Sequence, residues 1–194
     1  MPAIKRDSLW TLERYAKERH QFRARVMDHK KNRTVRLGPN LTLIFEDELT
    51  VRYQIQEMLR TERLFEEEAI CAELDAYNPL VPDGSNWKAT MMIEYADPGE
   101  RQAMLAKLIG IEDRVWVQAQ SCSRVYAIAD EDLDRENEEK TSSVHFLRFE
   151  FAPAVREALL RGAQISMGVD HPAYTTAIDV LEAPLADSLR QDLA

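Results

Sequence analysis

The side chains of this chain that are suited to metal binding or proton transfer near neutral pH are its four histidines and a few carboxylates. The histidines are His20, His29, His145 and His171. His20 and His29 fall in a basic helical stretch, where solvated side chains are expected. His145 lies inside an apolar strand pattern, and His171 directly follows Asp170 at the end of another. Two imidazoles and one carboxylate are the ligand set of open non-haem iron sites.

Three glutamates fall on the apolar side of the strongest helical pattern, which covers residues 47–77. The apolar stripe of that pattern passes through Val51, Ile55, Met58, Leu59, Phe65 and Ala69. On a wheel of about 100° per residue, Glu62, Glu66 and Glu73 lie inside the stripe. A buried carboxylate is costly unless it is paired or bound to a metal. The position of these acids therefore needs an explanation.

Three interpretations of these acids are open. Basic side chains such as Arg60, Arg63 and Arg148 neutralise them in a structural network, or the stripe is narrower and the acids are solvated. In the third, they help to form a metal site, with a non-haem transition metal such as iron as cofactor. The predicted metal ligands are His145, His171, Asp170, Glu62 and Glu66. The Glu-x-x-His motif of di-iron bundles is absent from the sequence.

Other kinds of chemistry have little support in the sequence. The chain has no glycine-rich phosphate loop and no Gly-x-Ser-x-Gly nucleophile motif. Cys71 and Cys122 are far apart and match no zinc or redox spacing, which suits a reducing compartment. Cys71 is expected in the core of its helix. The sequence leaves open whether the protein is an enzyme.

The composition indicates a globular protein of the cytoplasm. The chain has 194 residues, of which 45% are hydrophobic and 30% are charged. No run approaches the roughly 18 apolar residues of a membrane span. The N-terminus carries charges where a signal peptide needs an apolar stretch, which argues against export.

The charge is unevenly distributed along the chain. Residues 1–36 contain eleven basic and four acidic residues, while the whole chain has a net charge of -9. Such a split suits a self-complementary surface, a protein partner or an arm that binds nucleic acid. The basic side chains of that arm include Arg14, Lys17, Arg23, Arg25, Lys30, Lys31, Arg33 and Arg36. The acidic remainder and the apolar spacing within the arm favour an amphipathic helix over nucleic-acid binding.

The pattern of the whole chain predicts one α+β domain over residues 1–194. The expected segments are a basic helix over about 8–31, a hairpin and a long helix over about 33–77, and a strand-rich part over about 88–181. Within the last part, residues 115–120 and 124–129 predict a hairpin, and residues 130–140 an exposed loop or helical turn. We expect a mainly antiparallel sheet of about six to eight strands, a long N-terminal helical layer and short helices.

Five runs of the sequence resemble a known bacterial family of unknown function. They are GPNLTL (38–43), VRYQIQEMLR (51–60), ELDAYNPL (73–80), KTSSVHFLRF (140–149) and GVDHPAY (168–174). The resemblance covers essentially the whole chain but implies no catalytic residues. It implies a context, since such proteins are often encoded beside rubrerythrin-like and iron–sulfur proteins.

Two functions from different classes follow from these observations. The first is an accessory or metal-binding component of an iron- or peroxide-related redox system, with rubrerythrin-like or iron–sulfur proteins as partners. The second is a non-enzymatic interaction module, forming a homo-oligomer or a complex through opposite charges. Nucleic-acid binding through the basic helix ranks below both, and no membrane association is expected.

Overall fold

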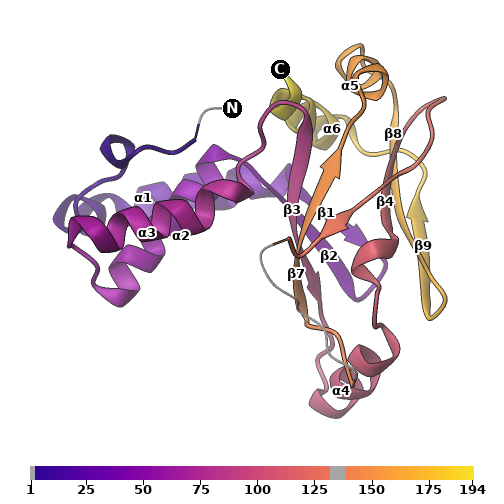
Figure 1. Ribbon diagram of the computed structural model, residues 1–194, viewed down its shortest axis with the longest axis horizontal. Helices are drawn as coiled ribbons and strands as arrows, with labels where there is room; N and C mark the ends of the chain where they lie inside the picture. Colours follow the sequence, from indigo (N-terminus) through magenta and orange to yellow (C-terminus); the bar gives the residue numbers. More distant parts are fainter. Residues whose placement is uncertain (1–2, 132–138) are drawn as a thin grey trace.

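The computed structural model describes residues 3–131 and 139–194, and it divides them into a helical part and a part made of two β-sheets (Figure 1). The helices of these residues, with 3-10 helices marked η, are η1 (Arg6–Ser8), α1 (Leu12–Lys31), α2 (Glu48–Glu62), α3 (Glu67–Tyr77), η2 (Asn78–Leu80), α4 (Pro98–Lys107), η3 (Glu112–Arg114), α5 (Pro153–Leu160), α6 (Ala183–Arg190) and η4 (Gln191–Leu193). The strands are β1 (Thr34–Leu37), β2 (Leu41–Glu46), β3 (Asn86–Ile93), β4 (Val115–Ala119), β5 (Val125–Tyr126), β6 (Ile128–Ala129), β7 (Val144–Glu150), β8 (Ile165–His171) and β9 (Tyr174–Ile178). Most of the segment 130–140, predicted as an exposed loop or turn, lies outside the described residues.

All the strand pairs of the described residues are antiparallel, which confirms the predicted α+β class. The first sheet has the strand order β1-β2-β3-β7-β6, and the second has the order β5-β4-β8-β9. The sequence predicts a single strand over residues 124–129, and this prediction is wrong. β5 pairs with β4, whereas β6 pairs with β7 in the other sheet. The chain changes sheets at Ala127, whose N–H donates to the carbonyl of Val115 at 2.9 Å.

The main core lies between the two sheets. Alternate residues of β3 are buried, as expected for a strand with one face toward a core. Trp87 is fully buried there, packs edge-on against Phe45, and donates from Nε1 to the carbonyl of Leu189 at 2.8 Å. Val117 and Met167 contribute the facing side chains from the second sheet. This core keeps the ends of β4, β6 and β7 in place.

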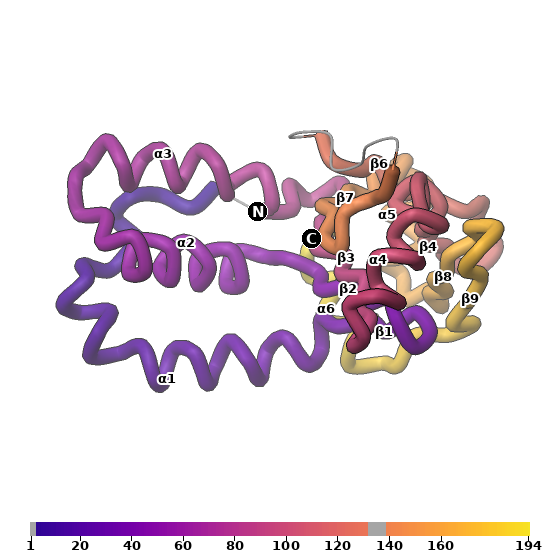
Figure 2. Tube along the Cα trace, turned by 90° about the horizontal axis from the view of Figure 1, so that it is seen from below, coloured from indigo at the N-terminus to yellow at the C-terminus, as the bar shows by residue number. Residues whose placement is uncertain are grey.

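The helices α1, α2 and α3 run side by side and project from the first sheet (Figure 2). Asp47 begins α2 with a capping box: its side chain accepts from the Thr50 N–H, and the Thr50 hydroxyl accepts from the Asp47 N–H. Between α1 and α2, Tyr15 and Phe22 pack with Tyr53 of α2. The apolar spacing of the basic stretch therefore marks an amphipathic helix, as predicted.

The helical and sheet parts are joined through Arg33, which is only 1% exposed. Its Nε donates to the carbonyl of Phe45 at 2.8 Å, and its Nη2 donates to the carbonyl of Glu46 at 2.9 Å. The same Nη2 pairs with the Asp192 carboxylate at 2.5 Å. Arg33 was included among the basic surface groups of the nucleic-acid interpretation. That placement is wrong, because the side chain is enclosed between β2 and the C-terminal helices.

The sequence predicts one helix over residues 47–77, and the structure breaks it in two. Arg63 has the left-handed conformation, with φ of 56°, and ends α2. The chain then turns, so that Ile70 and Leu74 of α3 pack against the apolar face of α2. The turn also changes which residues face inward. Cys71, predicted to be buried, is exposed on α3.

The helices of the described residues are too short or too polar to cross a lipid bilayer.

Candidate metal centre

The five side chains predicted as metal ligands lie in three separate places. Glu62 ends α2 and Glu66 precedes α3, so both lie at the turn farthest from the sheets (Figure 2). Asp170 and His171 end β8 in the second sheet, whereas His145 lies in β7 of the first. The structure therefore does not bring these five side chains to one point. Of the five, only His145 belongs to a cluster of potential metal ligands among the described residues.

The helix break explains why the glutamates do not form an inward-facing group. Because α3 is a separate helix, the apolar stripe of α2 does not continue beyond Arg63. Both Glu62 and Glu66 are exposed. Glu73 is partly buried, and this burial, together with the nearby charge of Glu62, raises the pKa of Glu73. Solvation of the acids, one of the three open interpretations, is thus what the structure shows for Glu62 and Glu66.

His171 has backbone partners on both sides of its ring. Its Nδ1 accepts from the Ala173 N–H at 3.2 Å, which leaves the proton on Nε2 to reach the carbonyl of Ile109 at 3.1 Å. Asp170 accepts from the Tyr126 hydroxyl at 2.6 Å and lies 3.5 Å from Arg124. These contacts hold the end of β8 in place and leave neither ring nitrogen of His171 directed at another imidazole.

His145 lies instead with Glu112 and Asp130, and each of the three offers one ligand atom within 4.8 Å of the other two. We call this group, with Thr141 and the backbone carbonyl of Ser142, the His145 centre. His145 is fully buried because its position on β7 alternates with half-buried ones and faces the core. Glu112 comes from η3 before β4, and Asp130 directly follows β6.

Asp130 fixes the orientation of the imidazole. Its Oδ2 lies 2.5 Å from Nδ1 of His145, while its Oδ1 accepts from the Phe146 N–H at 2.9 Å. Asp130 has a φ of 49°, in the left-handed region that few residues other than glycine adopt. This conformation lies at the end of β6 and places the carboxylate next to Nδ1 of the ring. A carboxylate on one ring nitrogen is the usual support for a histidine whose other nitrogen binds a metal.

The second ring nitrogen, Nε2, faces three oxygen atoms. It lies 2.9 Å from the Thr141 hydroxyl, 3.0 Å from the Ser142 carbonyl and 3.9 Å from the Glu112 carboxylate. The Thr141 hydroxyl is itself 3.4 Å from Glu112. A carbonyl oxygen only accepts, so its approach to Nε2 is favourable in one of two ways. Either Nε2 carries a hydrogen and donates it to the carbonyl, or a metal ion lies between the two atoms.

These separations suit the ligands of one metal ion. Ligand bonds of about 2.0–2.2 Å place neighbouring donors about 3–3.5 Å apart in tetrahedral or octahedral coordination. The distances from Nε2 to Thr141 and Ser142 are near this range, whereas the distance of 3.9 Å to Glu112 is longer. One imidazole with several oxygens is a donor set that suits iron, manganese or zinc.

Sequence reasoning found His145 but missed its acidic partners. Asp130 lies at the start of an acidic segment that has no strand or helix pattern, and Glu112 lies in a short turn. Neither shows a spacing that predicts a ligand. The one signal near the centre was the run 140–149, quoted above for the family resemblance, which includes Thr141, Ser142 and His145.

Comparison with known proteins gives this chain a family but no activity. Residues 3–193 match the family described as "Protein of unknown function (DUF3501)". The chain belongs to the DUF3501 family. It is also similar to the crystal structure of a novel protein of unknown function from Burkholderia pseudomallei K96243, with 55% sequence identity over 100% of both chains and a TM-score of 0.94. No curated protein matches the chain. The DUF3501 match confirms the family resemblance seen in the sequence.

Proposed function

We propose that this protein binds one transition-metal ion at the His145 centre. The observation that carries the proposal is the position of Nε2, which faces the oxygens of Thr141, Ser142 and Glu112 while Asp130 holds the opposite nitrogen. Nε2, the Glu112 carboxylate and the two further oxygens are the proposed ligands. Asp130 orients the ring through its contact with Nδ1.

The proposed setting is an accessory role in iron- or peroxide-related redox metabolism in the cytoplasm. The support for this setting is the family resemblance, which implies that such proteins are often encoded beside rubrerythrin-like and iron–sulfur proteins. The centre is enclosed, with His145 fully buried and Glu112 only 5% exposed. Such enclosure suits a bound ion that stabilises the fold or tunes a partner more than one that meets a large substrate.

Metal analysis tests the proposal directly. Protein made in iron-supplemented medium is expected to retain close to one equivalent of metal, and chelation is expected to lower its melting temperature. Glu112→Gln removes a ligand charge at nearly constant shape, and Asp130→Asn removes the support of the ring. We expect each to weaken metal affinity by about tenfold to a hundredfold. His20→Ala, an exposed histidine on α1, serves as the matched control and should bind as the parent does.

Two results would contradict metal binding at the His145 centre as proposed. One is less than about a tenth of an equivalent of any transition metal together with a melting temperature unaffected by chelator. In that case Nε2 simply donates its hydrogen to the Ser142 carbonyl, and the His145 centre is a structural hydrogen-bond network. The other is equal metal affinity in Glu112→Gln and the parent protein, which would show that Glu112 is not a ligand and that the metal lies elsewhere.

A protein-interaction role is the second candidate, and the shape of the molecule favours it. The three helices project from the sheets (Figure 2). Cationic side chains of α1, including Lys17 and Arg25, are exposed. Phe65, at the turn between α2 and α3, is 71% exposed. A large exposed aromatic residue at the end of a projecting element is typical of a contact with another protein.

A further inference from the structure

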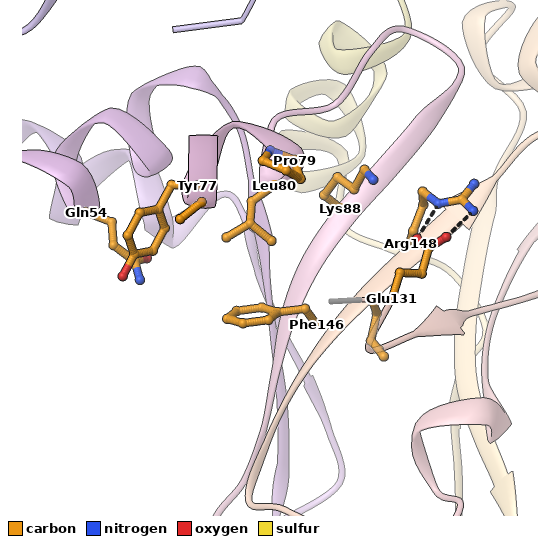
Figure 3. Close-up of a pocket in the computed structure, with 10 residues that line it drawn as sticks. Gln54, Tyr77, Pro79, Leu80, Lys88, Glu131, Phe146 and Arg148 are labelled. Atoms are coloured by element: carbon orange, nitrogen blue, oxygen red, sulfur yellow. Dashed lines mark hydrogen bonds and ion pairs between the residues drawn. The ribbon is translucent and has the colours of Figure 1, made fainter. Parts of the chain in front are cut away.

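A cavity of about 340 Å³ lies between the helical part and the outer face of the first sheet (Figure 3). Its size is near the lower end of the roughly 300–1,000 Å³ that is typical of small-molecule sites. It is separate from the His145 centre, whose side chains face the opposite side of the sheet. None of the groups proposed to hold the metal lines this cavity.

One side of the cavity is apolar. Tyr77 from the end of α3, Leu80 from η2 and Phe146 from β7 face the hollow from different elements (Figure 3). Pro79 lies beside Leu80 and stiffens the turn that brings α3 back toward the sheet. This wall suits a flat or branched hydrocarbon body and offers few hydrogen-bonding groups to it.

The other side of the cavity is cationic. Lys88 of β3 and Arg148 of β7 are directly opposite each other in the strand register, an arrangement that is unfavourable for like charges. Arg148 is satisfied by its neighbours, since it donates two hydrogen bonds to Glu131 and one to Glu150. Lys88 receives no such compensation. Among residues 3–131 and 139–194, its ammonium group has no hydrogen-bond acceptor and no ion pair partner within 4.0 Å.

The surroundings of Lys88 are poorly suited to a lone ammonium group. Burial, and then the charge of Arg148, lower the pKa of Lys88, and the attraction of the Glu131, Asp83 and Glu150 carboxylates offsets this lowering only in part. An anion placed next to Lys88 would offset both effects, because it would neutralise the ammonium and shield it from Arg148. A cation would add a third like charge, and a neutral apolar molecule would bury the ammonium without a partner.

We propose that this cavity binds a small monocarboxylate with an apolar body, with its carboxylate on Lys88 and its body against Tyr77, Leu80 and Phe146. Of the described residues that line the cavity, Lys88 is the cation without a carboxylate within 4.0 Å, and one such ammonium group matches a ligand with one negative charge. Glu131 and Glu150 occupy Arg148 and disfavour ligands of higher charge, such as phosphate esters. The cavity volume limits the ligand to about ten non-hydrogen atoms, with about 30 Å³ per small group.

Binding of phenylacetate and of its neutral isostere phenylacetamide, measured by titration calorimetry, tests the proposal. Phenylacetate is expected to bind, and phenylacetamide is expected to bind about tenfold more weakly or not at all, because it lacks the charge that pairs with Lys88. Lys88→Met should reduce phenylacetate affinity by a similar factor, and Lys88→Arg should restore part of it. Lys107→Met, an exposed lysine of α4, is the matched control and should leave binding unchanged.

Several results would overturn this assignment. Equal affinity for phenylacetate and phenylacetamide, or an unchanged affinity in Lys88→Met, would show that Lys88 does not pair with the ligand. The absence of binding for phenylacetate and for a series from acetate to octanoate at millimolar concentration would show that the cavity is not a carboxylate site. Near-ultraviolet circular dichroism of each variant confirms that the fold is kept. Chelator-treated protein should bind equally well, so failure of the metal proposal does not affect this test.

Discussion

The buried guanidinium of Arg33 lies between two carboxylates whose pKa values move in opposite directions. Burial raises the pKa of Asp192 to about 6, although the charge of Arg33 acts against this shift. Burial also acts to raise the pKa of Asp47, but Arg33, the Thr50 N–H and His29 together outweigh it and lower the pKa. One cation therefore holds two acids, of which Asp47 keeps its charge more firmly.

The raised pKa of Asp192 predicts a particular pH dependence of stability. Between its unfolded pKa of about 3.9 and its folded value near 6, the folded state binds more protons than the unfolded state. The contribution of this group is therefore present at low pH and is lost as the pH rises through that window. The loss amounts to at most about 3 kcal/mol. Urea unfolding of the parent and of Asp192→Asn from pH 4 to 7 measures it.

The parent protein should lose stability relative to Asp192→Asn as the pH rises. Asp187→Asn removes an acid from the preceding helix α6, where its side chain is 69% exposed, and should show no such trend. A parent that gains stability relative to Asp192→Asn over this range would show that Arg33 outweighs burial and that the assigned direction is wrong.

The break between α2 and α3 illustrates what periodicity does not reveal. Residues 63–66 contain no glycine or proline, so the apolar pattern continues through them without an interruption. The break depends on Arg63 adopting the left-handed conformation and on the Leu64 N–H bonding the carbonyl of Leu59 at 2.9 Å. Helix ends that are marked by capping residues or proline are predictable from the sequence. One example is the start of α4, where Asp97 is the N-cap and Pro98 follows it.

Glycine at position 63 should stabilise the protein. Arg63 has a φ of 56°, which glycine adopts without steric cost, and glycine is the commonest residue where helices end in this way. We expect Arg63→Gly to raise the free energy of unfolding by about 0.5–1 kcal/mol. Arg60→Gly, one turn earlier within the helix, should lower it by a similar amount. Urea titrations of both variants give the comparison, and a loss of stability in Arg63→Gly would contradict it.

The His145 centre also shows where sequence reasoning stops. The apolar pattern predicts that His145 lies inside a strand, and it lies in β7. Asp130 reaches the ring from 15 residues away only because the chain leaves the second sheet at Ala127 and joins the first as β6. That change of sheet occurs within a stretch that reads as one continuous strand. The partners of His145 are set by this tertiary path and carry no spacing signal of their own.

The folded molecule exposes fewer unpaired cations from residues 1–36 than the sequence of that segment suggests. Arg33 is internal, Arg19 pairs with Glu57, and Lys31 pairs with Asp28. The surface of α1 nevertheless keeps exposed cations, including Lys17 and Arg25, on a chain whose net charge is -9. Opposite charges on different copies favour association at low ionic strength.

If the helical part mediates self-association, the mass in solution should depend on salt. Light scattering should find a dimer or larger species at low salt that dissociates at about 0.5 M salt, where screening acts over a few ångströms. Charge reversal by Lys17→Glu with Arg25→Glu should abolish the low-salt species, whereas Lys107→Glu on α4 should not. A monomer at both salt concentrations would exclude self-association through opposite charges.

The pairing of Arg33 with Asp192 also constrains how this protein is made. The two residues are 159 positions apart, so the ribosome delivers the cation long before its anionic partner. Throughout that interval the nascent β1–β2 hairpin carries a guanidinium without the acid that later encloses it. The first sheet can therefore reach its final packing only after the segment that contains Asp192 has left the exit tunnel.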